Sequence, residues 1–144
     1  MKVTSLLFSI IILAVAACSP APKTIQYGFD VCHFCKMTIV DKQHAAELVT
    51  EKGKVYLFDA IECMVQFTEV QPDLQFAFEL VNDYDQPEKL IDAHQSAFLI
   101  CREIPSPMGA YLSAFSGKEK AEQIMRQKGG EIYTYENLKS HLKK

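Results

Sequence analysis

Cys32, Cys35 and Met37 place three sulfur atoms within six positions, in the stretch VCHFCKMTIVD that covers residues 31–41. A Cys-x-x-Cys pair serves thiol redox chemistry, zinc binding or the binding of a softer metal. Methionine shifts the balance, because a thioether is a poor ligand for zinc and a good ligand for Cu(I). On an extended segment, Cys35 and Met37 point to the same face and can share one ion. The spacing therefore favours Cu(I).

Two other uses of the cysteine pair are weaker but stay open. A thioredoxin-like redox site needs a helix directly after the pair, whereas residues 37–40 are β-forming. Zinc needs four ligands, and no second ligand pair is visible. Cys63 and Cys101 are isolated in apolar segments, so we expect both to be small buried core residues. A zinc site would have to combine Cys32 and Cys35 with two histidines.

The N-terminus predicts export from the cytoplasm. Lys2 precedes a short apolar run that ends in Ala16, Ala17 and Cys18, the layout of a signal peptide. Small residues before a cysteine resemble a bacterial lipobox, which makes Cys18 the lipidated first residue of the mature chain. Ser19 at the next position favours the outer membrane. We expect a signal peptide over residues 1–17, a tether over 18–27 and one domain over 28–144; ordinary secretion with a free Cys18 is the alternative.

Composition bounds the class of protein. The 144 residues are 49% apolar, enough for one domain with a hydrophobic core. The formal net charge is −3 and offers no basic surface, which argues against nucleic acid as a partner.

Alternating and helical patterns predict an α+β domain. The predicted strands cover residues 37–40, 46–50, 55–58, 75–81, 97–101 and 131–134. A turn occupies 51–54, a loop 82–87 and an irregular proline-rich segment 104–109. Helices are expected from Asp59 to just before Pro72, over 118–128 and from Glu136 onward; Asp59 and Glu62 have the spacing of a capping box.

A short internal similarity suggests two related halves. Residues 55–61 match residues 132–138 in kind, and both follow a glycine turn and lead from a strand into a helix. A methionine lies upstream in each case, Met37 in the first half and Met108 in the second. The chain is therefore expected to form two small, similar strand-strand-helix halves.

Four segments together resemble the NosL family of copper-binding lipoproteins that assist nitrous oxide reductase. They are the motif at residues 30–37, Phe58 at the start of the first helix, Pro107-Met108-Gly109, and Gly129-Gly130 before the last strand. The resemblance implies a fold like that of the organomercurial lyase MerB, with two similar α/β halves. It also implies Cu(I) binding through sulfur and delivery of copper to the reductase through a membrane transporter complex.

The resemblance assigns metal ligands residue by residue. Cys35 and Met37 match the C-x-M core of the motif, and Met108 matches the second-half methionine, which implies a third ligand. Cys32 matches the first motif cysteine, with three roles open: a ligand, a disulfide partner of Cys35, or a support of the loop. Lys36 stands where glycine is common.

The histidines carry less information. His33 and His44 are supplementary ligand candidates, although a lone histidine is more often solvent-facing or structural. His94 and His141 have no motif around them.

The functional hypothesis is a lipid-anchored Cu(I) chaperone with no catalytic residues. It is expected in the cell envelope, at the outer membrane facing the periplasm, and it delivers copper to an extracytoplasmic enzyme such as nitrous oxide reductase. Two alternatives remain: a thiol-dependent oxidoreductase or lyase that uses Cys32 and Cys35, and a structural zinc-binding module.

Overall fold

The computed structural model describes residues 19–143. The predicted signal peptide and Cys18 lie outside the described residues. Within 19–143, no helix combines the length and apolar character needed to cross a membrane.

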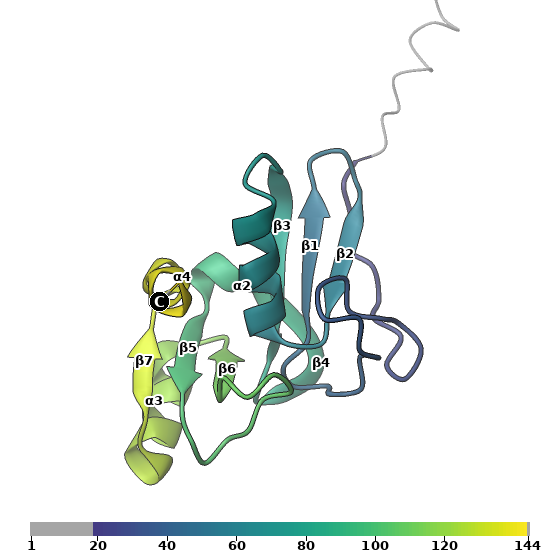
Figure 1. The fold of residues 1–144 in the computed structure, drawn as a ribbon. Coiled ribbons are helices and arrows are strands. Elements are labelled where there is room, and N and C mark those ends of the chain that lie inside the picture. The colour runs from purple at the N-terminus through teal and green to yellow at the C-terminus, as the bar shows by residue number, and fades with distance from the viewer. Residues whose placement is uncertain (1–18, 144) are drawn as a thin grey trace, which may run out of the picture.

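A mixed sheet of seven strands forms the centre of the fold (Figure 1). The strands are β1 (Ala46–Thr50), β2 (Val55–Phe58), β3 (Phe76–Asp83), β4 (Gln86–Asp92), β5 (Ala97–Ile100), β6 (Leu112–Phe115) and β7 (Glu131–Tyr133). Their order is β2-β1-β3-β6-β5-β7, with β4 paired to β3. Neighbours are antiparallel except β3 and β6, which meet in parallel through the pair Asp83 and Ala114. This short parallel pairing joins the strands β2, β1 and β3 to the strands β6, β5 and β7.

Among residues 19–143, three α-helices and one short 3₁₀ turn, η1 (Ala93–Gln95), accompany the sheet. Helix α2 (Ile61–Val70) packs on β1 and β2, where Phe67 lies 4.7 Å from Tyr56 and 5.3 Å from Phe58 between ring centroids. Helix α4 (Tyr135–Leu142) contacts α2 and stacks Tyr135 on Phe98 of β5. Both helices contribute to one hydrophobic core cluster.

Helix α3 (Lys118–Lys128) covers the opposite face of β5. Successive side chains of a strand point to opposite faces, and accordingly Phe98 belongs to the core of α2 and α4, whereas Leu99 packs with Ala121 of α3 in a second cluster. The predicted helix over 118–128 is confirmed, and it ends at Gly129.

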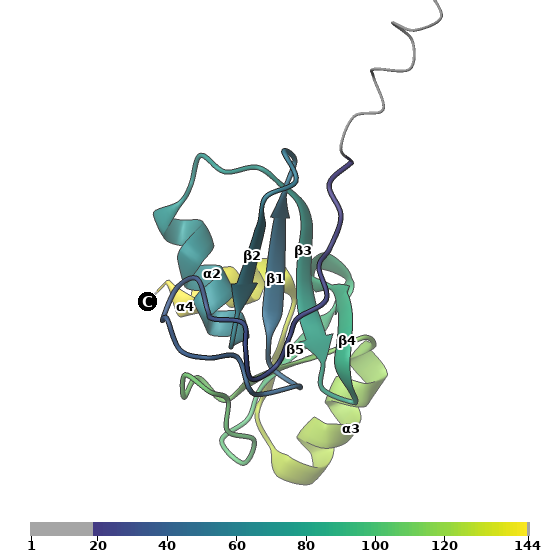
Figure 2. The same ribbon diagram turned by 90° about the vertical axis from the view of Figure 1, so that its right-hand side faces the viewer.

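The segment before β1 covers the face of β1 and β2 that α2 leaves free. Glu47 lies on this face, since its neighbours Ala46 and Leu48 pair with Phe58 and Tyr56 on the α2 side. The Glu47 carboxylate accepts a hydrogen bond of 2.7 Å from the backbone N–H of Lys23. Figure 2 shows the segment passing alongside β3 and then across the lower ends of β1 and β2.

The predicted α+β class is confirmed, but several local predictions need correction. The strands at 46–50 and 55–58 have the predicted bounds, whereas residues 37–40 do not form a strand: only Thr38 makes an isolated bridge, to Val31. Strands β4 and β6 were not predicted, and β4 begins inside the predicted loop 82–87.

The internal similarity corresponds to two comparable edges of the sheet. Strands β2 and β7 are the outer strands of the main order, and each leads within two residues into a helix, α2 or α4. The connections differ, since β2 follows β1 directly, whereas β6 and α3 separate β7 from β5. The similarity of two complete halves therefore stays a prediction.

Candidate metal centre

The cysteine motif lies in a tight loop that folds back on itself. Beside the bridge between Val31 and Thr38, the N–H of Cys32 donates to the carbonyl of Met37 at 2.8 Å. The N–H of Ile39 donates to Asp30 at 2.9 Å. Cys32 and Ile39 point inward and are fully buried, whereas Val31 and Thr38 point outward. The loop therefore holds Cys32 rigidly under its surface.

His33 fastens this loop to the free edge of β2. Its backbone N–H donates to the carbonyl of Leu57 at 2.8 Å, and its Nδ1 accepts from the N–H of Leu57 at 3.0 Å. These bonds extend the sheet hydrogen bonding onto the loop. His33 therefore has a structural role, with Leu57 as its partner, and its Nδ1 is not free to bind a metal.

Lys36 closes the loop in a left-handed conformation. Its φ is +68°, in the region that glycine adopts freely and other residues adopt at a cost. The Lys36 ammonium donates to the carbonyl of His33 at 2.6 Å. This geometry explains why glycine suits the position between Cys35 and Met37.

Replacing Lys36 with glycine is expected to stabilise the protein relative to Lys36→Ala by roughly 1 kcal/mol, because alanine keeps the strained Cβ. Both variants lack the ammonium contact to His33, so their difference isolates the backbone conformation. Urea unfolding of the two variants measures it. Equal unfolding midpoints would show that the loop adopts its left-handed turn without strain.

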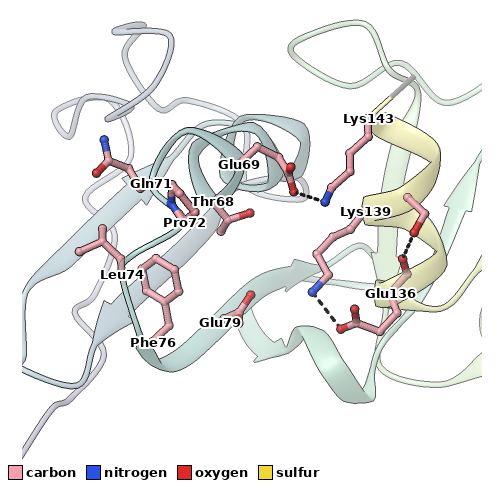
Figure 3. A pocket seen from close by; sticks show the side chains of 11 residues that line it. Thr68, Glu69, Gln71, Pro72, Leu74, Phe76, Glu79, Glu136, Lys139 and Lys143 are labelled. Atoms are coloured by element: carbon pink, nitrogen blue, oxygen red, sulfur yellow. Dashed lines mark hydrogen bonds and ion pairs between the residues drawn. The ribbon is translucent and has the colours of Figure 1, made fainter.

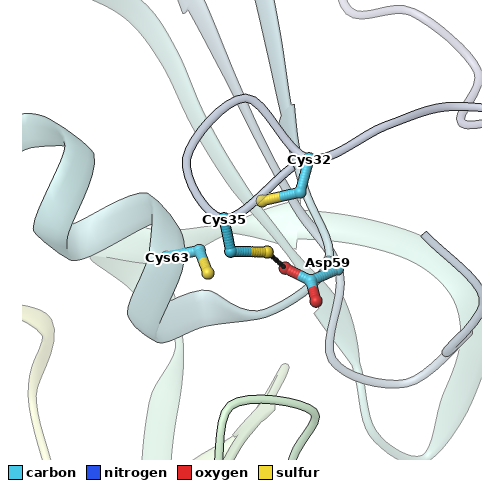
Figure 4. Close-up of side chains that lie close together, drawn as sticks. All are labelled: Cys32, Cys35, Asp59 and Cys63. Carbon is cyan, nitrogen blue, oxygen red and sulfur yellow. Dashed lines mark hydrogen bonds between the residues drawn. The ribbon is translucent and has the colours of Figure 1, made fainter. Parts of the chain in front are cut away.

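Three cysteines and one aspartate converge beneath this loop (Figure 4). The Sγ atoms of Cys32, Cys35 and Cys63 and a carboxylate oxygen of Asp59 all lie within 4.8 Å of one another. The Cys35 thiol donates to Oδ1 of Asp59 at 3.2 Å. Cys32, Cys63 and Asp59 are buried, whereas Cys35 is partly exposed. All three cysteines are free thiols, and Cys35 is the member of the cluster open to solvent.

The junction between β2 and α2 supplies two of the four groups, Asp59 and Cys63. A capping box of Asp59 and Glu62 was predicted, but α2 begins at Ile61 and its N-cap Ala60 has no side-chain hydrogen bond. Asp59 instead accepts from Cys35, and Glu62 points to another loop. The capping prediction is wrong because both carboxylates bind partners that are distant in sequence.

The pKa values of the thiols are pushed apart by their contacts. A hydrogen bond from the Cys63 thiol lowers the pKa of Cys32 to about 6, helped by the backbone N–H groups of Asp59 and Cys35. Burial raises the pKa of Cys35 to about 11, helped by its hydrogen bond to Asp59. The pKa of Cys63 is also raised, because its thiol donates to the Cys32 thiolate. At neutral pH the three thiols therefore carry one negative charge.

The spacing of the cluster suits a soft metal ion. Two thiolates bound to one ion at about 2.3 Å each lie at most about 4.6 Å apart, so the 4.8 Å limit needs only a small closure. Three sulfur donors favour Cu(I) or zinc over hard cations.

The sequence-predicted ligands divide into two groups. Cys32 and Cys35 are in the cluster, whereas the side chains of Met37 and Met108 lie at the surface, 55% and 42% exposed. Because Cys35 is part of a turn, the strand argument that put Cys35 and Met37 on one face does not apply.

The candidate ligand His44 and the remaining cysteine, Cys101, lie outside the cluster. His44 is buried, with Nδ1 2.9 Å from Asp41 and Nε2 3.1 Å from Ser113 Oγ, so both ring nitrogens are engaged. Cys101 packs in the core under α3, as expected of a small buried residue.

Sequence reasoning missed Asp59 and Cys63 as members of the cluster. Cys63 is buried as predicted, but beside the motif and not in an inert part of the core. The available signal was their closeness to one strand-to-helix junction, because Asp59 lies two residues before α2 and Cys63 lies in its first turn.

A separate cavity of about 280 Å³ lies at the far end of α2, against β3 and α4 (Figure 3). Ion pairs at its rim join Lys143 to Glu69 at 3.0 Å and Lys139 to Glu136 at 2.9 Å. None of the cysteines lines it, and the cluster of thiols lies at the opposite end of α2.

Comparison with known proteins finds a family model and a solved structure that match this chain. The family model described as NosL matches residues 24–142. The crystal structure of the copper chaperone NosL from Shewanella denitrificans is similar, with a TM-score of 0.64 and 26% sequence identity. That match covers 80% of this chain and 96% of the other. No curated protein matches the chain.

Proposed function

We propose that this chain, which belongs to the NosL family, is a lipid-anchored Cu(I) chaperone for an extracytoplasmic copper enzyme. Nitrous oxide reductase is the leading acceptor. It catalyses no reaction, and copper is its cargo. The observation that supports this most directly is the cluster of three thiols with only Cys35 open to solvent. Delivery by ligand exchange needs such an arrangement, because an acceptor must reach a bound ion that the chaperone still holds.

Cys35 is proposed as the ligand shared by two groups of donors. Beneath it are the buried thiols of Cys32 and Cys63, which hold the ion away from water and oxidants. The thioethers of Met37 and Met108, which lie at the surface, remain the sequence-derived ligand candidates. A thioether binds Cu(I) without a proton to lose, so exchange at the surface is simple. Asp59 orients Cys35 through their hydrogen bond.

The surface around Cys35 suits contact with another protein. Four large apolar side chains of the motif loop are exposed: Phe29 (83%), Val31 (48%), Met37 (55%) and Val40 (67%). Exposed apolar groups gathered on one loop mark an interaction site. We assign them to the copper-exchange partner, either the acceptor enzyme or a membrane transporter complex.

The proposed lipid anchor rests on the sequence alone. Cys18 directly precedes the described chain, and residues 19–22 lead to Lys23, which is bonded to Glu47 on the sheet. A tether this short would keep the domain close to the membrane, and Ser19 directly after the lipidated cysteine supports a location at the outer membrane facing the periplasm.

The stoichiometry of Cu(I) binding tests the function. The mature chain, reduced and free of metal, is titrated with Cu(I) against a competing chelator under anaerobic conditions. We expect one tightly held Cu(I) per chain. Failure to compete with a chelator of micromolar affinity would contradict the assignment.

One observation favours zinc as a second candidate. Asp59 supplies a carboxylate oxygen beside three thiols, and a Cys₃Asp set satisfies tetrahedral zinc. Metal analysis of the protein isolated without added copper separates the two roles. Stoichiometric zinc that Cu(I) does not displace would favour the structural module.

The thiol oxidoreductase or lyase is less well supported. The reactive form of cysteine is the thiolate, and the thiolate here belongs to Cys32, which is fully buried. The exposed thiol, Cys35, has a raised pKa and is protonated at neutral pH. An oxidoreductase would need the reverse arrangement.

A further inference from the structure

Glu62 is a buried carboxylate that joins two parts of the molecule far apart in sequence. It lies in the first turn of α2, next to Cys63, and its side chain is only 2% exposed. Its Oε1 accepts a hydrogen bond of 2.6 Å from the Ser106 hydroxyl and one of 3.3 Å from the backbone N–H of Ala110. Its Oε2 has no partner among the described residues.

The Ser106 hydroxyl and the Ala110 N–H, which both donate to Glu62, belong to residues that flank Met108. Ser106 and Ala110 stand on either side of Met108, and the N–H of Gly109 donates to the carbonyl of Ser106 at 3.0 Å, which closes a turn. Two prolines interrupt this segment, so it has no regular hydrogen bonding of its own to fix its place. Glu62 supplies that anchor from the helix that carries Cys63.

We propose that Glu62 is a positioning residue of the copper site: its carboxylate fixes residues 106–110 against the first turn of α2, so that Met108 is presented to Cu(I) held by the cysteines. This inference rests on the proposed function and extends it to a residue that is not itself a ligand. A buried carboxylate with one free oxygen is costly. The position of Glu62 in the first turn of α2 offsets part of that cost through the helix dipole.

The role makes a specific prediction about energetic coupling. In the unaltered chain, Met108→Leu is expected to lower Cu(I) affinity about tenfold through the loss of one thioether ligand. In a Glu62→Ala background the loop is no longer held, so the same change is expected to have no further effect. Glu62→Gln keeps an oxygen that accepts both hydrogen bonds and is expected to retain the Met108 effect. Competitive Cu(I) titration of these variants forms a double-mutant cycle.

A matched control separates positioning from general stability. Glu119 occupies the first turn of α3 and is exposed. Glu119→Ala removes a comparable charge from a helix N-terminus but should leave the Met108 effect unchanged. Met108→Leu with an equal effect in the presence and absence of Glu62, or with no effect in the unaltered chain, would overturn the proposal.

A second measurement does not depend on copper. Amide hydrogen exchange of residues 106–110 in the metal-free protein is expected to accelerate in Glu62→Ala, most strongly at Ala110, and to change less in Ser106→Ala, which loses only one of the two bonds. Unchanged exchange in Glu62→Ala would refute the positioning role. If the unaltered chain binds no Cu(I), the proposed function fails, and exchange still decides whether Glu62 fixes the loop.

Discussion

Cys35→Ser is expected to lower the affinity for Cu(I) by about 100-fold or more, the largest effect of any single substitution in this chain. Loss of a group that only orients a metal ligand costs roughly 10- to 100-fold in affinity. Loss of Cys35 is expected to cost more, because Cys35 is proposed as the ligand common to both groups of donors. Its thiol also completes the cluster with Cys32, Cys63 and Asp59. Competition with a Cu(I) chelator measures the change directly.

The matched control is Cys101→Ser, since Cys101 is equally a free cysteine but lies in the core under α3. It is expected to lower stability without altering Cu(I) affinity. Equal affinities for Cys35→Ser and the unaltered chain would remove Cys35 from the site, and with it the route by which a partner reaches the copper.

Substitution of the other donors then distinguishes the two ligand groups. Large losses in Cys63→Ser with small ones in Met37→Leu would place Cu(I) among the buried thiols. The opposite pattern would place it at the surface, in the set expected from the C-x-M motif. Asp59→Asn is expected to lower Cu(I) affinity less than the loss of a ligand does, because the Asp59 carboxylate acts on Cys35 through a hydrogen bond.

The two members of the cluster that lie in one loop could be predicted from the sequence, whereas the two at the junction of β2 and α2 could not. Cys32 and Cys35 are recognisable because their spacing is a property of one loop. Asp59 and Cys63 were interpreted as a helix cap and a core residue, which is what their local surroundings predict. Only the docking of His33 on the edge of β2 brings the loop over the start of α2, and such long-range pairing leaves no periodic signal.

The strands differ in the same way, since some have a local sequence pattern and others form only through long-range pairing. Strand β1 was predicted because it contains the β-branched Val49 and Thr50, and it is buried on both faces, including Glu47. Strand β4 is largely exposed and polar and contains Pro87, so propensity argues against it. It forms because it pairs with β3 at one position after another. Tertiary pairing here overrides the local preference of the chain.

The pH dependence of Cu(I) affinity is expected to report which thiols bind. Cys32, with a pKa of about 6, is already a thiolate above neutral pH and releases no proton on binding. Cys35, with a pKa of about 11, is protonated there and must lose its proton to the solvent. Cys63 has a raised pKa and must do the same if it is a ligand. Methionine releases none.

The sign and size of the effect follow from these proton counts. Metal competes with protons for each protonated thiol, so affinity rises with pH by about tenfold per unit for every proton released. Between roughly pH 7 and pH 9, binding through Cys35 with Met37 and Met108 predicts a rise of about 100-fold. Binding through both Cys35 and Cys63 predicts about 10,000-fold over the same interval.

Cu(I) titration at several pH values, corrected for protonation of the chelator, gives the slope, and direct measurement of released protons in weak buffer checks it. Cys63→Ser is the matched variant, because a serine hydroxyl can still donate to the Cys32 thiolate but has no proton to lose in this range. If Cys63 is a ligand, the slope in this variant falls from two protons to one; if it is not, the slope stays at one. An affinity independent of pH would show that Cys35 does not bind the metal as a thiolate, because its thiol is protonated in this range and would have to release a proton when Cu(I) enters.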